Sequence, residues 1–149
     1  MKKNQVLWSA FFLLCIVLPP TAQAGLMQKI IGEWQGNGYQ YDGARWSIEI
    51  IVSPSGSVSI SYPSLKCGGV LTLLEESETG ARFRENLRYG KECINQGTVR
   101  LIQLKPEHLE FFWYLPGGEL QAKGELVQVK KFPPALGPPS APAPFHGPK

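Results

Sequence analysis

The residue best placed to do chemistry in this sequence is Glu85, a carboxylate on the apolar face of a predicted strand. Strict alternation over 81–89 (ARFRENLRY) gives Glu85 the same parity as Phe83, so both side chains should face the interior. A buried carboxylate is costly unless it is paired or hydrogen-bonded. Glu85 could therefore anchor a ligand in an apolar pocket. The alternative, more common for interior polar groups, is a bond to loop backbone or to Arg45 or Arg100.

Large aromatic side chains are the other candidates for ligand binding. Five of them could line a pocket together with Glu85: Trp34, Trp46, Phe83, Phe111 and Trp113. Aromatic residues more often fill a core, so a packed interior is the alternative to a pocket.

Signals of catalysis and of metal binding are weak. His108 and His146 are the two histidines, and no serine nucleophile motif surrounds His108. We find no carboxylate pair placed for acid–base work and no phosphate-binding glycine loop. The cysteines and histidines lack the spacing of metal ligands. The sequence therefore predicts a protein that is not an enzyme and that needs no cofactor or metal.

The N-terminus predicts export. Lys2 and Lys3 precede the apolar run Val6–Leu18, and Ala22-Gln23-Ala24 is a small-x-small cleavage site. A run of about 13 residues is shorter than the roughly 20 that a membrane-spanning helix needs. We expect cleavage after Ala24, a periplasmic or secreted location, and no stable membrane insertion.

Export bears on the cysteines and on the charge. Cys15 would leave with the signal peptide, and the remaining pair, Cys67 and Cys93, should form a disulfide in an oxidising compartment.

The formal net charge would fall from +3 to +1 as Lys2 and Lys3 are removed. So weak a charge gives no electrostatic case for nucleic acid as a partner.

Composition and periodicity predict an all-β fold. The chain has 16 glycines, 13 prolines and 11% aromatic residues, with few apolar helical patterns. A helical turn over 25–31 should precede eight strands at 33–41, 45–53, 57–62, 70–74, 81–89, 98–104, 108–115 and 119–129. Short, evenly spaced antiparallel strands favour an eight-stranded up-and-down barrel or a sandwich with one disulfide.

Three local expectations follow from the same pattern. Trp46, Ile48, Ile50 and Val52 should face inward, with Ile51 as the exception. Cys67 should lie in a turn where Gly68-Gly69 folds the chain sharply. The strand Val70–Leu74, apolar on both faces, should be covered on both sides.

The chain divides into a signal peptide (1–24), a β-domain (25–132) and a tail (133–149). The tail holds seven prolines in 17 residues and almost no charge. Such a composition cannot build a core, so we expect a spacer or a docking segment.

Two resemblances bear on the fold. Gly32-Glu33-Trp34, after a short helical turn, resembles the G-x-W entry of the calycin barrels (lipocalins, avidins and fatty-acid-binding proteins). This resemblance implies a barrel in which Trp34 packs across the closed end. The chain lacks the large lipocalin loop after the first strand, and it has no arginine clearly placed to stack on Trp34.

The second resemblance covers more of the chain. Its first half is W-x-I-x-I at Trp46 to Ile50 and V-x-I-x-Y-P-S-L-x-C-x-G at Val58 to Gly69. Its second half is F-x-E at Phe83 to Glu85, C at Cys93, G-T-V-x-L at Gly97 to Leu101 and F-x-W at Phe111 to Trp113. This pattern resembles a small exported bacterial β-domain found in extracytoplasmic regions of some serine/threonine kinases. The resemblance implies a binding or sensing module and no kinase activity.

Together these observations predict an exported, non-catalytic protein that binds a small apolar or amphipathic ligand. The alternative is a periplasmic module that acts on another protein, as an enzyme inhibitor or an envelope-assembly partner. A cavity of about 300 Å³ or more beside Glu85 would favour ligand binding. An interior filled by Trp34, Trp46 and Trp113 would favour the alternative.

Overall fold

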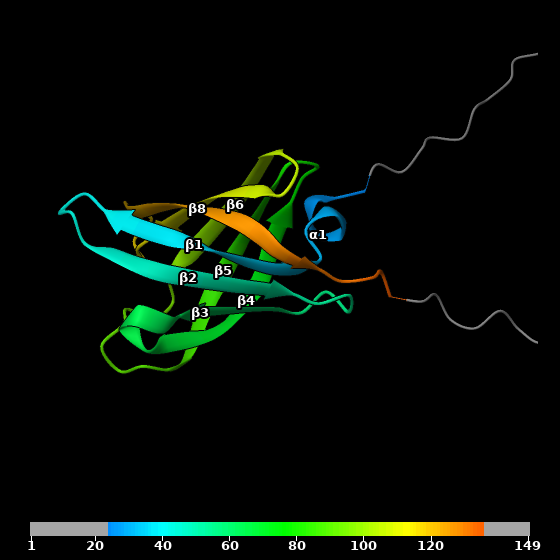
Figure 1. Ribbon diagram of the computed structural model, residues 1–149. Helices are drawn as coiled ribbons and strands as arrows, with labels where there is room; N and C mark the ends of the chain where they lie inside the picture. Colours follow the sequence, from blue (N-terminus) through cyan, green and yellow to red (C-terminus); the bar gives the residue numbers. More distant parts are fainter. Residues whose placement is uncertain (1–23, 136–149) are drawn as a thin grey trace, which may run out of the picture.

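The computed structural model describes residues 24–135, which form an eight-stranded antiparallel barrel (Figure 1). The elements in chain order are α1 (Leu26–Lys29), β1 (Gly32–Gln40), β2 (Arg45–Val52), β3 (Val58–Tyr62), the 3₁₀ helix η1 (Pro63–Leu65), β4 (Cys67–Glu76), β5 (Gly80–Tyr89), β6 (Thr98–Lys105), β7 (His108–Tyr114) and β8 (Leu120–Lys131). Each strand pairs with its neighbour in sequence, and β8 closes the barrel on β1. The predicted up-and-down barrel is confirmed, and the sandwich is not formed. Nearly all of the predicted signal peptide and most of the tail lie outside the described residues.

A short helix seals one end of the barrel (Figure 1). Apolar side chains of α1 and of the residues that follow it are buried there: Leu26, Met27, Ile30 and Ile31. Two bonds tie the helix to the turn between β4 and β5. The Leu26 N–H donates to the Ser77 carbonyl at 3.0 Å, and the Met27 N–H donates to Glu76 Oε1 at 2.7 Å. This end is therefore closed by packing and by hydrogen bonds.

The interior next to α1 is filled with large side chains. Trp34, Phe83 and Phe111 are each at most 1% exposed. Trp34 Nε1 donates to the Ile30 carbonyl at 2.8 Å, which satisfies the indole inside the core. Trp34 is thus part of the packed core at the closed end.

The alternation of β2 places its side chains as predicted. Ile48, Ile50 and Val52 are fully buried, whereas Ile51 is 43% exposed. Successive residues of a strand face opposite sides of the sheet, so each inward position of β2 contributes to the core.

The turn before β4 differs from the prediction. η1 reverses the chain with Lys66 in the left-handed conformation at φ 56°, and Cys67, Gly68 and Gly69 already belong to β4. The expectation that Cys67 lies in the turn and that the glycine pair folds the chain is wrong, because Lys66 supplies the reversal. The pairing of β4 with β5 shifts between Gly68 and Gly69, so the glycines accommodate an irregularity inside the strand.

The far half of β4 was also predicted incorrectly. Leu73 and Leu74 are 43% and 47% exposed, so the strand is not covered on both sides. The register shifts again between Leu73 and Glu75, and such an irregularity breaks the simple alternation of inward and outward positions.

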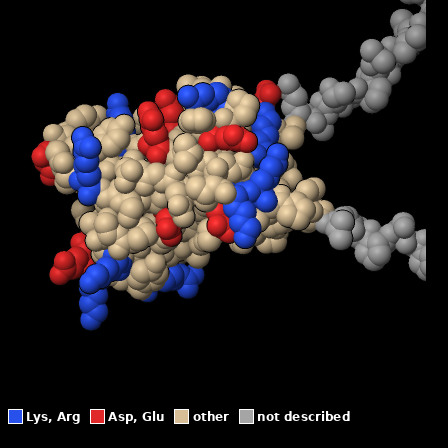
Figure 2. All heavy atoms as spheres, in the orientation of Figure 1, with Lys and Arg blue, Asp and Glu red and all other residues tan. Residues whose placement is uncertain are grey.

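The outer surface carries both signs of charge. Acidic and basic side chains are interspersed on the face shown in Figure 2. Mixed charge of this kind does not create the single-sign field that steers polyanions. Within residues 24–135, no helix is long and apolar enough to cross a membrane.

The predicted disulfide is present. Cys67, at the start of β4, is bonded to Cys93 in the loop between β5 and β6, with Cα atoms 6.4 Å apart and a sequence separation of 26. A cross-link over a loop of this length stabilises the fold mainly by restricting the unfolded chain.

We predict that replacing both cysteines with serine lowers the free energy of unfolding by about 3 kcal/mol, because the unfolded chain regains the entropy of the open loop. Urea unfolding followed by tryptophan fluorescence measures the change. A reductant should shift the wild-type midpoint in the same direction and leave the double variant unchanged. Equal midpoints for the two proteins would contradict the prediction.

Candidate functional site

A pocket of about 570 Å³ is bordered by the β1–β2 hairpin, the η1 turn and the loop after β5. The hairpin and η1 lie at the barrel end opposite α1 (Figure 1). The interior faces of β2, β5 and β7 complete the lining of the pocket. The lining residues are Gln40, Ala44, Arg45, Trp46, Tyr62, Ser64, Leu65, Lys66, Glu85, Leu87, Glu92, Cys93, Ile94 and Trp113. The interior of the barrel is therefore filled at one end and hollow at the other.

One wall of the pocket is the η1 turn, which β2 holds in place. The backbone N–H of Ser47 donates to Ser64 Oγ at 3.0 Å, and the backbone N–H of Ser64 donates to Ser47 Oγ at 3.1 Å. This reciprocal pair fixes the position of Leu65 and Lys66 at the pocket mouth.

A second wall, next to η1, is the loop between β5 and β6. The disulfide anchors it through Cys93. Asn95 anchors it a second time, because its Oδ1 accepts the Leu87 N–H at 2.8 Å. Glu92 and Ile94 of this loop line the pocket, so two independent restraints set the width of the mouth.

The floor of the pocket is built around Glu85. The Tyr62 hydroxyl donates to Glu85 Oε1 at 2.5 Å, and Trp113 Nε1 donates to Glu85 Oε2 at 2.9 Å. The Glu85 backbone N–H is held by the Gly97 carbonyl at 2.9 Å. Glu85 is fully buried, while Tyr62 and Trp113 keep 5% and 9% of their surface exposed. The two aromatic side chains therefore hold the carboxylate and also line the pocket.

Burial dominates the electrostatics of this floor. Desolvation raises the pKa of Glu85 above its ordinary value of 4.5, and the hydrogen bonds from Tyr62 and Trp113 only partly offset it. Desolvation and the neighbouring Glu85 charge raise the pKa of Tyr62 well above its ordinary range. Tyr62 thus remains a protonated donor, and Glu85 is the group that titrates.

Two glycines let the pocket tryptophans lie against the backbone. Gly38 is the cross-strand partner of Trp46, and a Cβ atom there would come within 2.8 Å of Trp46 Cε2. A Cβ atom at Gly97 would come within 2.6 Å of Trp113 Nε1. Both ring positions therefore require the absence of a side chain on the neighbouring strand or loop.

The residues predicted from sequence separate into two groups. Trp46, Glu85 and Trp113 come together at the pocket. Trp34, Phe83 and Phe111 are buried in the core and do not line it. Of the two interpretations of Glu85, the structure has its carboxylate satisfied by neighbours, yet neither Arg45 nor Arg100 is one of them.

Sequence reasoning missed the partners of Glu85 and the mouth of the pocket. Tyr62 shares the inward parity of β3, and this was the one signal that could have identified it. Arg45, Lys66 and Glu92 are exposed at the mouth. None of these three forms an ion pair among the described residues.

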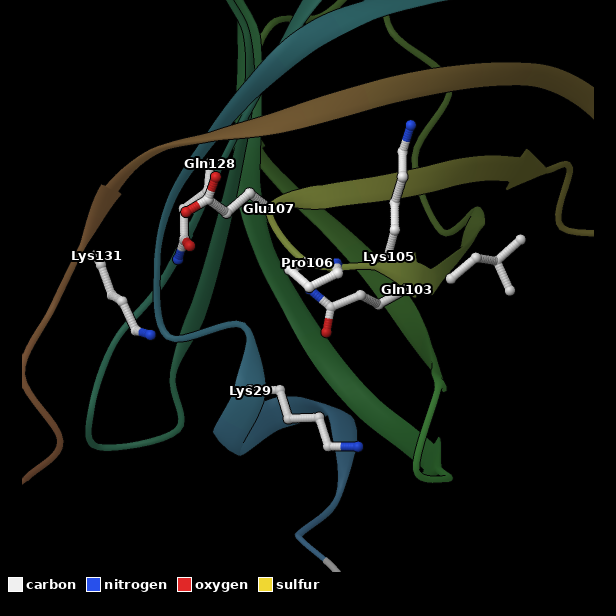
Figure 3. Close-up of a pocket in the computed structure, with 8 residues that line it drawn as sticks. Lys29, Gln103, Lys105, Pro106, Glu107, Gln128 and Lys131 are labelled. Atoms are coloured by element: carbon white, nitrogen blue, oxygen red, sulfur yellow. The ribbon is translucent and has the colours of Figure 1, made fainter.

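A smaller pocket of about 290 Å³ lies at the closed end (Figure 3). Lys29, Lys105 and Lys131 border it, but their side chains point in different directions in Figure 3. Lys29 Nζ is also engaged by Glu78 Oε1 at 3.3 Å. These lysines do not converge as an anion site would require.

Groups suited to catalysis are sparse in the described part of the chain. His108 is exposed, with Nδ1 3.1 Å from the Pro106 carbonyl. No cluster of three or more His, Cys, Asp or Glu residues that could hold a metal occurs within 24–135. The arrangement at the pocket can bind and orient a molecule.

Comparison of the chain with protein-family models, with curated proteins and with solved structures found no match. The two resemblances drawn from motifs therefore stay predictions, and the case for function depends on the pocket itself.

We predict that Glu85→Leu lowers the free energy of unfolding by at least about 2 kcal/mol, because it leaves the Tyr62 and Trp113 donors buried without an acceptor. Glu85→Gln should cost less than about 1 kcal/mol, since its amide oxygen can accept from Trp113 and its NH₂ group can donate to the Tyr62 oxygen. Urea unfolding measures both. Equal losses in the two variants would contradict this assignment of the hydrogen bonds.

We also predict that stability falls as the pH rises through the titration of Glu85. Because the pKa of Glu85 is raised on folding, the native state binds more protons than the unfolded state between the two pKa values, so the free energy of unfolding decreases across that window. The free energy of unfolding of the wild type minus that of Glu85→Gln should therefore decline from about pH 4.5 upward. It should level off above the pKa of Glu85 in the folded protein. Parallel stability curves would show that Glu85 is not the group responsible.

Proposed function

We propose that this protein is an exported, non-catalytic binding protein whose ligand is a small apolar or amphipathic molecule held in the hollow end of the barrel. Export would place the chain in the oxidising compartment in which the Cys67–Cys93 disulfide persists.

The observation that carries the proposal is the pocket beside Glu85. Its volume of about 570 Å³ exceeds the 300 Å³ at which small-molecule sites begin. A barrel of this size can fill its interior with side chains, and the α1 end does so. The opposite end contains two tryptophans and still keeps an opening, so packing alone does not account for its shape.

The lining has the polarity of an amphipathic site. Trp46, Leu87 and Trp113 supply apolar surface inside the pocket. Arg45 and Lys66 supply exposed polar groups at the mouth. A ligand with an apolar body and one polar end would match both zones.

A second candidate function, binding of another protein at the mouth, is supported by exposed apolar residues there. Leu65 of the η1 turn and Ile94 of the β5–β6 loop are 48% and 55% exposed. Residues of this kind occur in protein interfaces. Native mass spectrometry of the protein purified from its own cells distinguishes the two candidates, because a retained small molecule and a bound protein differ greatly in added mass.

We predict that the neutral fluorescent probe N-phenyl-1-naphthylamine binds the wild type saturably and in a one-to-one ratio. Leu87→Trp should abolish this binding by filling the pocket, because Leu87 is part of its lining. Leu74→Trp is the matched control, since Leu74 is 47% exposed and does not line the pocket. A fluorescence titration at constant protein concentration provides the measurement.

Loss of binding in Leu87→Trp with retention in Leu74→Trp supports the proposal. Absence of saturable binding to the wild type, or equal binding by the two variants, would rule out the barrel pocket as the site.

A further inference from the structure

The most distinctive chemical feature of the pocket is its three aromatic side chains, two of which are bonded to one buried carboxylate. Trp46, Tyr62 and Trp113 all line the pocket, and Tyr62 and Trp113 both donate to Glu85. Aromatic faces that border a pocket attract organic cations through the negative potential of their π systems. A nearby buried anion strengthens this attraction, because little solvent screens it.

The aromatic group is held rigidly, as a recognition site requires. Trp113 is fixed at its nitrogen by Glu85 and lies against Gly97. Tyr62 is fixed at its hydroxyl by the same carboxylate. Trp46 lies against Gly38. Each ring is therefore positioned before a ligand arrives, which lowers the entropy lost on binding.

Glu85 lacks a cationic partner in the described part of the chain. Its carboxylate accepts only from the two neutral donors, and none of the ion pairs within residues 24–135 includes it. A positive charge placed against Trp113 would lie near this buried anion without displacing either hydrogen bond. The pocket thus has no positive charge paired with Glu85 in the described part of the chain, and a cationic ligand can supply one.

The basic residues at the mouth do not reverse this preference. Arg45 and Lys66 are exposed, so water and salt screen their charges. Glu92, exposed on the β5–β6 loop, carries the opposite charge and offsets one of them. Glu85 is fully buried and acts through a medium that screens much less. The buried anion therefore outweighs the exposed cations for a charge inside the pocket.

We propose that the pocket recognises a quaternary or methylated ammonium group, bound among Trp46, Tyr62 and Trp113 with Glu85 as the buried counter-charge. This assignment rests on the proposed ligand-binding function and specifies the chemical class of its ligand. Glu85 has two roles here: it fixes the Tyr62 and Trp113 rings by hydrogen bonds, and its charge attracts the cation.

Proton linkage follows from the position of Glu85. The titratable and charged groups that border the same pocket are Arg45, Tyr62, Lys66 and Glu92. The three charged residues are exposed, and Tyr62 stays protonated, so Glu85 is the group coupled to binding. A bound cation stabilises the ionised carboxylate. Affinity for an ammonium ligand should therefore rise with pH through the titration of Glu85 and then become constant.

The test compares choline with 3,3-dimethylbutan-1-ol, a neutral molecule in which carbon replaces the quaternary nitrogen. Isothermal titration calorimetry with the full-length secreted protein measures both dissociation constants. We expect choline to bind at least about tenfold more tightly than its neutral analogue. Choline binding near the pKa of Glu85 should also release a proton, seen as a dependence of the heat on the buffer.

Two variants test which residues cause the preference for choline over its neutral analogue. Glu85→Gln keeps both hydrogen-bonding partners and should remove most of the preference for choline together with the proton release. Trp46→Leu does not touch Glu85 and should weaken choline binding more than binding of the neutral analogue. An unchanged far-UV circular dichroism spectrum and a cooperative urea transition show that each variant is folded. If Glu92→Gln removes the preference while Glu85→Gln keeps it, the assignment to the buried carboxylate is wrong.

The outcomes separate this inference from the proposed function. Equal affinity for choline and its neutral analogue, or binding of neither while N-phenyl-1-naphthylamine still binds, overturns the ammonium assignment and leaves ligand binding intact. Failure of all three compounds to bind overturns both. Dihexanoylphosphatidylcholine, tested as a monomer, carries the same trimethylammonium group on a lipid, and its affinity relative to choline shows which source the pocket favours.

Discussion

The hydrogen bonds from Tyr62 and Trp113 to Glu85 connect three strands across the interior of the barrel. β3 contributes Tyr62, β5 contributes Glu85 and β7 contributes Trp113, and these strands are not neighbours in the sheet. Phe83 and Phe111 precede Glu85 and Trp113 by two residues on their strands and are fully packed. The cluster therefore forms the boundary between the filled and hollow halves of the barrel.

The geometry of this boundary depends on groups that have no obvious role when considered separately. A carboxylate in the interior is unfavourable unless its oxygens are satisfied, and here both are. The two donors are in turn satisfied by that carboxylate. Glycine at position 97 leaves room for the Trp113 indole and supplies the carbonyl that holds the Glu85 backbone. Removing any one of these groups would leave another buried polar group without a partner.

Sequence alone could predict eight antiparallel strands, arranged as a barrel or a sandwich, and the burial of Glu85, because these follow from a period of two residues and from local turn signals. It could not predict that Tyr62 and Trp113 bond to Glu85, since contacts across a barrel depend on the stagger of strands distant in sequence. The misplaced turn at Gly68-Gly69 has a similar cause. A left-handed Lys66 ends the turn there, and a non-glycine residue in that conformation carries no clear sequence signal.

Ligand contact and fold stability make different demands on the two ends of this barrel. At the α1 end, Ile30 and Trp34 fill the space completely, and this gives the greatest apolar burial. At the other end the disulfide and Asn95 fasten the β5–β6 loop to β4 and to the backbone of Leu87. Held there, the loop forms part of the pocket lining and does not fill the barrel, so Trp46 and Trp113 border open space. The filled end therefore stabilises the fold by apolar burial, and the open end is the part on which our proposal of ligand binding depends.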